Sequence, residues 1–183
     1  MADKAGKPVF KPLFTEAQIQ KRVSELAAEI SSTIGGGRLL CLVVLRGGFF
    51  FASDLIRQLK GFERIEIDFV RLASYAGMHS TGDVKFRGQL PPIAGCNVLV
   101  IEDLLDTGTT LSTLSEALRA GGAASVRYAV LVDKGGRAGK GIEPNFVAFG
   151  KLAKDDYLIG YGMDYEGAHR EQRSISVTKR IEN

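Results

Sequence analysis

An acidic pair and a threonine-rich turn follow one another in residues 98–114, which read VLVIEDLLDTGTTLSTL. Glu102 and Asp103 come directly after four apolar residues typical of a buried strand, and residues 106–110 lead into a helical pattern. Consecutive backbone amides at the start of a helix bind phosphate, because they carry partial positive charge and lack partners inside the helix. Carboxylates beside such a turn suit a ligand that also carries sugar hydroxyls or a bound Mg²⁺ ion. The segment therefore indicates a site for a phosphorylated sugar.

A second interpretation of this turn is purely structural, with threonine and aspartate serving as helix caps. The short pattern Asp-Thr-Gly alone favours that interpretation. The full pattern adds four apolar residues, an acidic pair and two further apolar residues, and a cap needs none of them. The turn is not a Walker loop either, because the GxxxxGK[ST] pattern and its lysine are absent from it. We therefore favour a ligand site of another kind.

The elements that must position this turn follow from the spacing of apolar residues. One helix is expected between a capping box at Thr15 and Gln18 and the glycine Gly35, and two more over residues 49–59 and 110–120. Apolar runs predict strands over residues 39–45, 65–72, 98–101, 126–132, 146–149, 157–161 and 174–178. This alternation favours an α/β fold with a doubly wound, mostly parallel sheet flanked by helices. Such sheets bind ligands at the carboxyl ends of their strands, where the acidic pair lies.

Size and composition set the remaining expectations. A chain of 183 residues is expected to form one domain over residues 1–183, with its first dozen residues mobile. Residues 74–88 are polar, glycine-rich and without a clear period, as in a mobile active-site lid. The net charge of +3 is too small to indicate nucleic acid, and no signal sequence or membrane span is evident, so a cytoplasmic enzyme is expected. Cys41 and Cys96 have neither disulfide nor metal-ligand spacing.

The string VIEDLLDTGTT resembles the phosphoribosyl-pyrophosphate signature of the type I phosphoribosyltransferases. Within that family the chain is similar to the hypoxanthine (hypoxanthine-guanine) enzymes of purine salvage, from about Phe14 to Val177. Four further segments carry the resemblance: a diphosphate loop at 45–48, a lid at 71–83, a base-reading segment at 131–134, and a base-stacking and metal segment at 157–165. The signature alone identifies the superfamily, and the last two segments point to a 6-oxopurine.

The resemblance implies the type I phosphoribosyltransferase fold, with a small hood subdomain built from the chain termini. It implies transfer of ribose 5-phosphate from 5-phospho-α-D-ribose 1-diphosphate to hypoxanthine and guanine, which gives IMP or GMP and diphosphate. Mg²⁺ is the implied cofactor, with Glu102, Asp103 and Asp164 as its ligands. A homodimer or homotetramer is the implied assembly, and neither nucleic acid nor membrane is an implied partner.

The implied donor site follows residue by residue. Glu102 and Asp103 would bind the ribose hydroxyls, and Asp106 would lie near the purine N7 as general acid or base. The 5′-phosphate would be held by Asp106, Thr107, Gly108, Thr109 and Thr110. The diphosphate would be held by Arg46, Gly47, Gly48 and Arg170, with an unusual cis peptide in the loop. The lid would close through Ser74 and Tyr75 and exclude water.

The implied base site consists of three residues. Lys134 corresponds to a lysine that donates to the 6-oxo group, Tyr157 to an aromatic that stacks on the base, and Leu158 to a residue whose carbonyl meets the group at purine C2. Without the resemblance, Lys134 reads equally well as a surface lysine, and Tyr157 reads better as a core tyrosine. No role is implied for His79 or His169.

Two alternatives stay open at this point. One is a phosphoribosyltransferase for another base: xanthine-guanine, adenine or a pyrimidine. Lys134 and the segment 157–165 argue against adenine, because a lysine ammonium group donates to an oxo group and not to an amino group. Xanthine specificity depends on contacts around C2 that the sequence leaves open. The other alternative is a regulatory protein of the same fold that binds RNA, which the small net charge and the full set of site residues disfavour.

Overall fold

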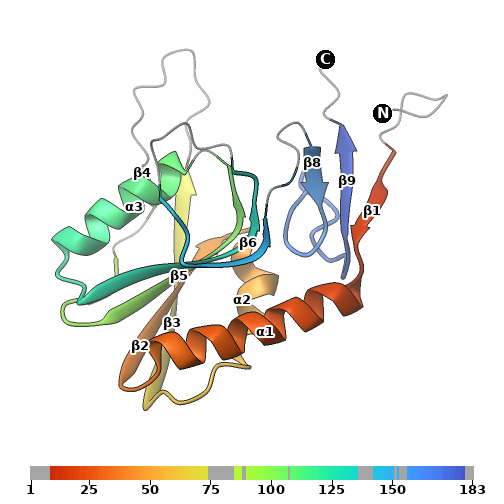
Figure 1. Cartoon of the computed structure of the whole chain (residues 1–183). Coiled ribbons are helices and arrows are strands. Elements are labelled where there is room, and N and C mark those ends of the chain that lie inside the picture. Colours follow the sequence, from red (N-terminus) through yellow and green to blue (C-terminus); the bar gives the residue numbers. More distant parts are fainter. Residues whose placement is uncertain are drawn as a thin grey trace.

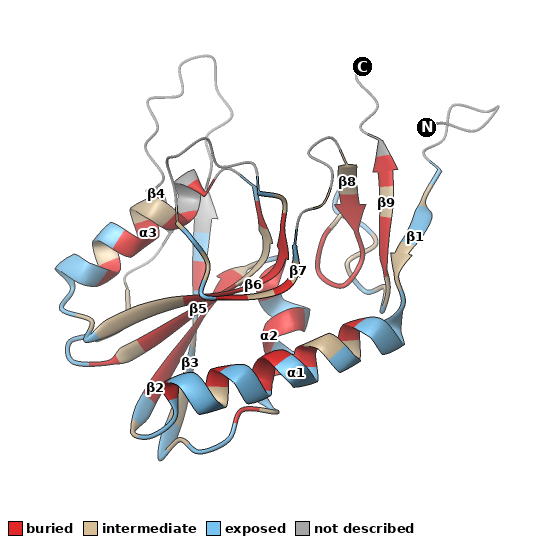
Figure 2. Cartoon of the chain, in the orientation of Figure 1, coloured by how far each residue is buried: buried red, intermediate tan, exposed pale blue. Residues whose placement is uncertain are grey.

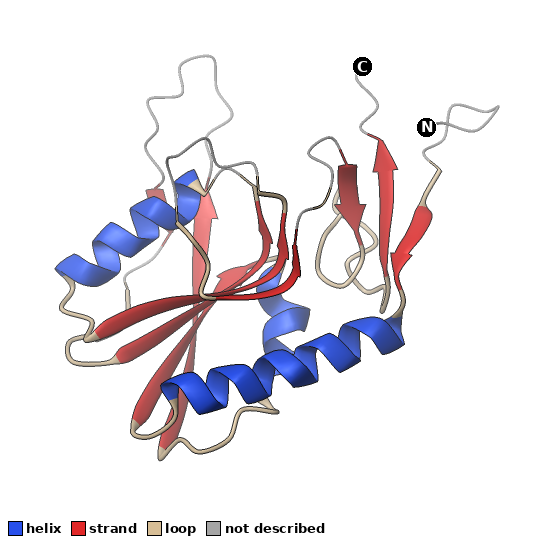
Figure 3. Cartoon of the chain, in the orientation of Figure 1, coloured by secondary structure: helices blue, strands red, loops and turns tan. Residues whose placement is uncertain are grey.

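The computed structural model describes residues 9–73, 85–87, 90–106, 108–135, 142–150, 152 and 156–179. The strands and helices of this part form two sheets, with the helices packed around the larger one (Figure 3). In chain order the elements are β1 (Lys11–Phe14), α1 (Glu16–Ile34), β2 (Arg38–Leu45), α2 (Gly48–Ile56), β3 (Arg64–Ala73), β4 (Lys85–Arg87), β5 (Asn97–Leu105), α3 (Thr109–Ala120), β6 (Ser125–Asp133), β7 (Phe146–Gly150), β8 (Asp156–Ile159) and β9 (Ile175–Lys179). This order confirms the predicted α/β class.

The larger sheet has the strand order β4-β3-β2-β5-β6-β7. Strands β3, β2, β5, β6 and β7 are parallel, and β4 joins the edge of β3 in antiparallel orientation. In β2 the odd-numbered residues 39, 41 and 43 pack with α1 and α2, whereas residues 40, 42 and 44 pack with α3. Helices therefore cover both faces of the sheet, which confirms the doubly wound arrangement and explains the unbroken apolar run of β2.

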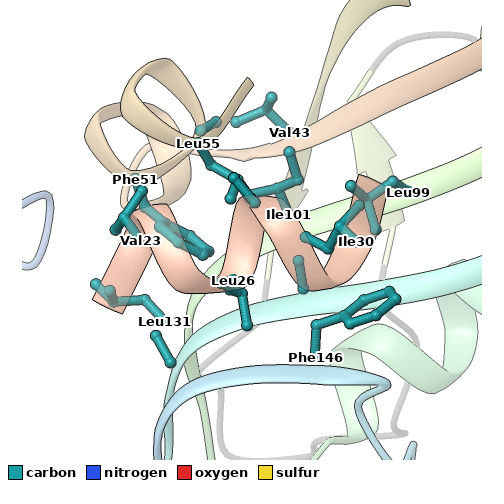
Figure 4. Packing of buried hydrophobic residues seen from close by; sticks show 14 of the residues in the cluster. Val23, Leu26, Ile30, Val43, Phe51, Leu55, Leu99, Ile101, Leu131 and Phe146 are labelled. Atoms are coloured by element: carbon teal, nitrogen blue, oxygen red, sulfur yellow. The ribbon is translucent and has the colours of Figure 1, made fainter. Parts of the chain in front are cut away.

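Helix α1 begins at the predicted capping box. The Gln18 amide donates to Thr15 Oγ1 at 3.3 Å, and the Thr15 amide donates to Gln18 Oε1 at 2.9 Å. The helix ends where the Gly35 amide donates to the Ser31 carbonyl. Figure 4 shows its apolar face packed against strand and α2 residues of the core. The fully buried residues of that face are Ile19, Val23, Leu26 and Ile30.

The smaller sheet is built from the two ends of the described chain. Strand β9 lies between β1 and β8 and is antiparallel to both, so the N- and C-terminal segments lie side by side (Figure 1). Leu158 and Ile175 of this sheet belong to the same buried cluster as α1, and the Phe14 ring stacks on Phe149 of β7 at 4.0 Å. Residues of the two sheets therefore share one buried cluster. The hood subdomain and the single domain over residues 1–183 stay predictions.

Several predicted boundaries differ from the structure. Strand β1 was missed, and the expected mobility is wrong for Lys11 and Pro12, because both pair with β9. Strand β5 continues to Leu105, so the acidic pair lies inside the end of the strand. Residues 85–87 of the predicted lid form β4. The rest of that lid, residues 74–84 and 88, lies outside the described residues.

In α1 the buried residues recur at helical spacing along one face, as the apolar spacing predicted (Figure 2). Within the described residues, no helix combines the length and the apolar character that a membrane crossing requires. Cys41 and Cys96 are both buried and both free, so neither contributes a covalent link.

Candidate functional site

Three predicted site segments follow directly from adjacent parallel strands. Arg46 follows β2, Asp106 follows β5 and Lys134 follows β6, and these strands are neighbours in the sheet. The last residues of β5 and β6 are in register, since Leu105 pairs with Asp133, and the Lys134 amide donates to the Leu105 carbonyl at 3.0 Å. The fold therefore gathers the three segments at the carboxyl edge of the sheet, where ligands bind in this architecture.

The loop after β2 lies against the acidic pair. The Leu45–Arg46 peptide bond is cis, one bond before the Arg46–Gly47 pair. A Cβ added to Gly47 would lie 1.8 Å from Asp103 Oδ2, and one added to Gly48 would lie 3.0 Å from the Ile101 carbonyl oxygen. Only residues without a side chain allow this close approach. The backbone of the predicted diphosphate loop and the Asp103 carboxylate thus form one surface.

Glu102 and Asp103 are half-buried carboxylates in direct contact. The Asp103 amide donates to Glu102 Oε1 at 3.2 Å. Burial in the first place, and the Asp103 carboxylate in the second, raise the pKa of Glu102 well above its usual range. A pair held in this way favours a nearby cation.

The acidic pair fits Mg²⁺. Within the described part of the chain, no three His, Cys, Asp or Glu side chains gather closely enough to hold a metal ion. Mg²⁺ needs no such cluster, because it keeps several waters and is bound through one or two carboxylates together with substrate phosphates.

The predicted phosphate turn opens helix α3. Gly108 has φ 76°, a left-handed conformation that glycine adopts freely, and its carbonyl accepts from the Ser112 amide at 2.9 Å. The amides of the first turn of α3 therefore have no partner inside the helix. The Asp106 side chain is exposed and free to meet a ligand. Thr107 lies outside the described residues, as do the side chains of Thr109 and Thr110.

Lys134 lies next to the predicted base-stacking segment. Its Nζ donates to the carbonyl oxygen of Asp156, the first residue of β8, which places Lys134 beside Tyr157. Tyr157 is half-buried, and its ring meets Tyr165 edge-on at 5.8 Å. Leu158 is buried, with 4% of its surface exposed, in the centre of β8. Lys134, which follows β6, therefore contacts β8, although the two are 22 residues apart in sequence.

Asp164 and Arg170 form an ion pair with each other. Arg170 Nη1 also donates to the Gly162 carbonyl at 2.5 Å, and the Gly167 amide donates to Asp164 Oδ2 at 2.8 Å. Each of the two charged side chains is thus held by the loop between β8 and β9. Sequence reasoning predicted them as a metal ligand and a diphosphate-binding residue but did not predict their pairing.

The same loop touches the diphosphate loop. A Cβ added to Gly162 would lie 2.0 Å from the Gly47 carbonyl oxygen. Beside this contact, the Tyr161 hydroxyl donates to Asp54 Oδ2 of α2 at 2.7 Å. Sequence reasoning missed both partners, since it placed Tyr161 at the end of a strand and Asp54 on a helix without further role. No local pattern reports a contact between residues so distant in sequence.

The remaining predicted residues are placed only in part. Ser74, Tyr75 and His79 lie outside the described residues. His169 packs against the Phe10 ring at 5.2 Å and lies 3.1 Å from Gln172 Nε2. These contacts hold His169 within the loop between β8 and β9.

Known proteins share both the sequence and the fold of this chain. Residues 13–159 match the family model described as a phosphoribosyl transferase domain. A hypoxanthine-guanine phosphoribosyltransferase of Staphylococcus aureus is 37% identical over 169 residues, 91% of this chain and 92% of that protein. The human hypoxanthine-guanine phosphoribosyltransferase is 34% identical over 87% of this chain and 76% of that protein.

Solved structures agree with these relatives. The crystal structure of a hypoxanthine phosphoribosyltransferase from Staphylococcus aureus superposes with a TM-score of 0.85 at 35% identity, over 92% of this chain and 91% of that one. A hypoxanthine-guanine phosphoribosyltransferase from Bacillus anthracis gives 0.82 at 32% identity, over 92% and 97%. The chain therefore belongs to the phosphoribosyltransferases, and within them to the hypoxanthine-guanine phosphoribosyltransferase family of glycosyltransferase-type enzymes.

Proposed function

We propose that this enzyme transfers ribose 5-phosphate from phosphoribosyl pyrophosphate to the 6-oxopurines hypoxanthine and guanine, giving IMP or GMP and diphosphate. The observation that supports it best is the meeting of two loops: the backbone of Gly47 lies against Asp103 on one side and against Gly162 on the other. A donor loop and a base-side loop in contact can hold both reactants of a group transfer together. A cytoplasmic location belongs to the same proposal.

The residues at the edge of the sheet divide the work on the donor. Amides of residues 106–110 hold the 5′-phosphate, and the Gly47 backbone and Arg170 hold the diphosphate. Glu102, Asp103 and Asp164 would hold Mg²⁺, and the bound ion would supply positive charge beside the departing diphosphate. Ser74 and Tyr75 of the lid exclude water from the cationic sugar.

The base-side residues position the acceptor and manage its proton. Tyr157 stacks on the purine, Lys134 donates to its 6-oxo group, and the Leu158 carbonyl accepts from the group at C2. Purine N9 bonds to the anomeric carbon as the bond from that carbon to diphosphate oxygen breaks. The proton on N7 of the incoming base passes to Asp106, whose side chain is exposed at this edge.

A direct assay tests the reaction. The protein is mixed with phosphoribosyl pyrophosphate, Mg²⁺ and one of hypoxanthine, guanine, xanthine, adenine or uracil, and nucleotide and diphosphate are measured together. Turnover with hypoxanthine and guanine is the expected result. Turnover with adenine or uracil alone would contradict the base site, and a lack of turnover with every base would contradict the enzymatic proposal as a whole.

We also propose that the enzyme works as a homodimer or homotetramer, assembled through an apolar surface beside the site. Among the described residues, five large apolar side chains are exposed: Val9, Phe49, Phe50, Ile67 and Phe69. All but Val9 come from the start of α2 and from β3. Val43 of β2 lies next to both elements: it pairs with Phe69 of β3, and it is 3.6 Å from a Cβ added to Gly48, the first residue of α2.

A second copy of the chain is the occupant that such a surface favours, because two-fold association buries the same apolar patch on both subunits at once. Light scattering on the purified protein tests it. Phe69→Asp should shift the mass toward the monomer, whereas Val9→Asp, an equal change at the remaining exposed position, should not. Equal masses for wild type and Phe69→Asp would place the interface elsewhere.

A further inference from the structure

The turn from Gly160 to Met163 belongs to the loop between β8 and β9, which also carries Arg170, and it contacts the diphosphate loop at Gly47. Its own backbone is closed by the Gly160 amide, which donates to the Met163 carbonyl at 2.9 Å. The Tyr161 amide donates to the Gln172 carbonyl at 2.7 Å, and the Gly162 amide donates to the Arg170 carbonyl at 3.0 Å. Hydrogen bonds therefore join the turn to the Arg170 backbone, and Gly162 of this turn contacts Gly47.

We propose that the hydrogen bond from Tyr161 to Asp54 is a positioning contact: it ties this turn to α2 and so sets the spacing between Arg170 and the diphosphate loop. The proposal rests on the function proposed above. Helix α2 begins at Gly48, directly after Gly47, so a bond to Asp54 anchors the turn to the element that carries the loop. Neither residue touches substrate in this arrangement; both act through the groups that they place.

The Asp54 carboxylate is built to receive this bond. Besides Tyr161, it accepts from Gln20 Nε2 of α1 at 2.8 Å and from Arg57 Nη2 at 2.6 Å. Burial acts to raise the pKa of Asp54, but the hydrogen bonds from Tyr161, Gln20 and Arg57 outweigh it and lower that pKa. The carboxylate stays charged at neutral pH, and a hydroxyl that donates to a charged acceptor makes one of the stronger hydrogen bonds in proteins.

Tyr161 is held in an unusual position. Its side chain is buried, with 4% of its surface exposed, and its φ is 47°, in the left-handed region that side chains other than glycine rarely adopt. Such a conformation persists where surrounding contacts determine it. Here those contacts are the backbone bond to Gln172 and the side-chain bond to Asp54. Tyr161 therefore connects the loop that follows β8 of the smaller sheet to α2.

The contact bears on one part of the donor only. Gly47 and Arg170, the proposed diphosphate-binding groups, both contact Gly162 of the Tyr161 turn, whereas the 5′-phosphate turn at 106–110 lies between β5 and the start of α3. Loss of the hydroxyl should therefore weaken binding of ligands that carry diphosphate and spare binding of a nucleotide that lacks it.

The test compares these two ligands in Tyr161→Phe. The KM for phosphoribosyl pyrophosphate should rise on the order of tenfold, as expected for one lost hydrogen bond to a charged group, with kcat changed much less. The Kd for IMP, measured by calorimetry, should stay at the wild-type value. Asp54→Leu should likewise raise the KM for phosphoribosyl pyrophosphate and leave the Kd for IMP unchanged. Asp54→Asn keeps an acceptor oxygen, so its KM for phosphoribosyl pyrophosphate should stay close to the wild-type value.

Two controls separate positioning from stability. Arg57→Ala removes another partner of the same carboxylate without touching the turn, and Tyr128→Phe removes a buried tyrosine hydroxyl of β6 in the cluster beside α3, on the other face of the larger sheet. Both should leave the KM for phosphoribosyl pyrophosphate unchanged. A lower Tm for Tyr161→Phe with an unchanged KM, or an equal weakening of IMP, would overturn the proposal. Absence of turnover in the wild type would instead contradict the proposed function. In that case the Kd for phosphoribosyl pyrophosphate, measured by calorimetry for wild type and Tyr161→Phe, would still test the role of the bond from Tyr161 to Asp54.

Discussion

The two halves of the site are built in opposite ways. On the donor side, Glu102, Asp103 and the 106–110 turn come from one continuous segment that runs off β5 into α3. On the base side, β8 is held in a sheet with β1 and β9, so its position depends on residues at both ends of the described chain. This part of the donor site, which binds ribose and the 5′-phosphate, is local in sequence, and the base half is not. Changes in the first should therefore alter chemistry at constant stability, whereas changes in the second should alter both.

The largest effect is expected at Asp106. Asp106→Asn removes the proposed acid-base group and should lower kcat about 10²–10⁴-fold, with little change in binding of phosphoribosyl pyrophosphate or in Tm. Steady-state kinetics and calorimetry check this. Glu116→Gln, the same change at an exposed carboxylate of α3, should leave kcat at the wild-type value. A loss of donor binding as large as the loss of kcat would make Asp106 a binding residue only.

The next effect is expected at the contact of the diphosphate loop with the acidic pair. Gly47→Ala places a methyl carbon 1.8 Å from Asp103 Oδ2. This distance is far too short for a non-bonded contact, so the loop and the carboxylate must move apart. A displacement of that size should lower kcat/KM for phosphoribosyl pyrophosphate about 10²-fold. In Gly150→Ala the new methyl group meets, among the described residues, only Val147 at 3.9 Å, and kinetics should be unchanged. Similar kinetics for both variants would show that the loop accommodates the methyl group.

A moderate effect on stability is expected where the smaller sheet joins the larger one. Phe14→Ala removes the ring that stacks on Phe149, which should lower the free energy of unfolding by about 1–3 kcal/mol for a half-buried aromatic. Because β1 supports β9 and β9 supports β8, the KM for hypoxanthine should rise as well. Phe62→Ala, at another half-buried ring of the same core, should lower stability without that rise in KM. Urea unfolding and kinetics, taken together, test the difference.

The smallest effect concerns stability in acid. The pKa of Asp54 is lower in the folded protein than in the unfolded chain, so its contribution to stability is complete above the ordinary aspartate range and is lost as the pH falls through the lowered value. Asp54→Asn should therefore flatten the acid part of a plot of unfolding free energy against pH. Tyr161→Phe should flatten it in part, because one of three donors is removed. Parallel acid limbs for wild type and Asp54→Asn would contradict this.

Much of the fold was predictable because its signals are local. The capping box at Thr15, the buried runs of β2 and β5 and the glycines after α1 and α3 each report on neighbouring residues. Strand β1 escaped prediction because its four residues have no apolar period of their own and are a strand only through pairing with β9. The Tyr161 turn escaped for a similar reason, since nothing near it in sequence identifies its partner on α2.

The sequence by itself determined the part of the donor site that binds ribose and the 5′-phosphate: the acidic pair, the phosphate turn and the strand that presents them are consecutive, and their order is enough to predict their chemistry. Only the tertiary structure decided how that part meets the diphosphate loop and the base half. The contacts of Gly47 with Asp103 and Gly162, of Lys134 with Asp156, and of Tyr161 with Asp54 join residues that are distant in sequence. Such contacts depend on how whole elements pack, and packing is a property of the complete fold that no local pattern encodes.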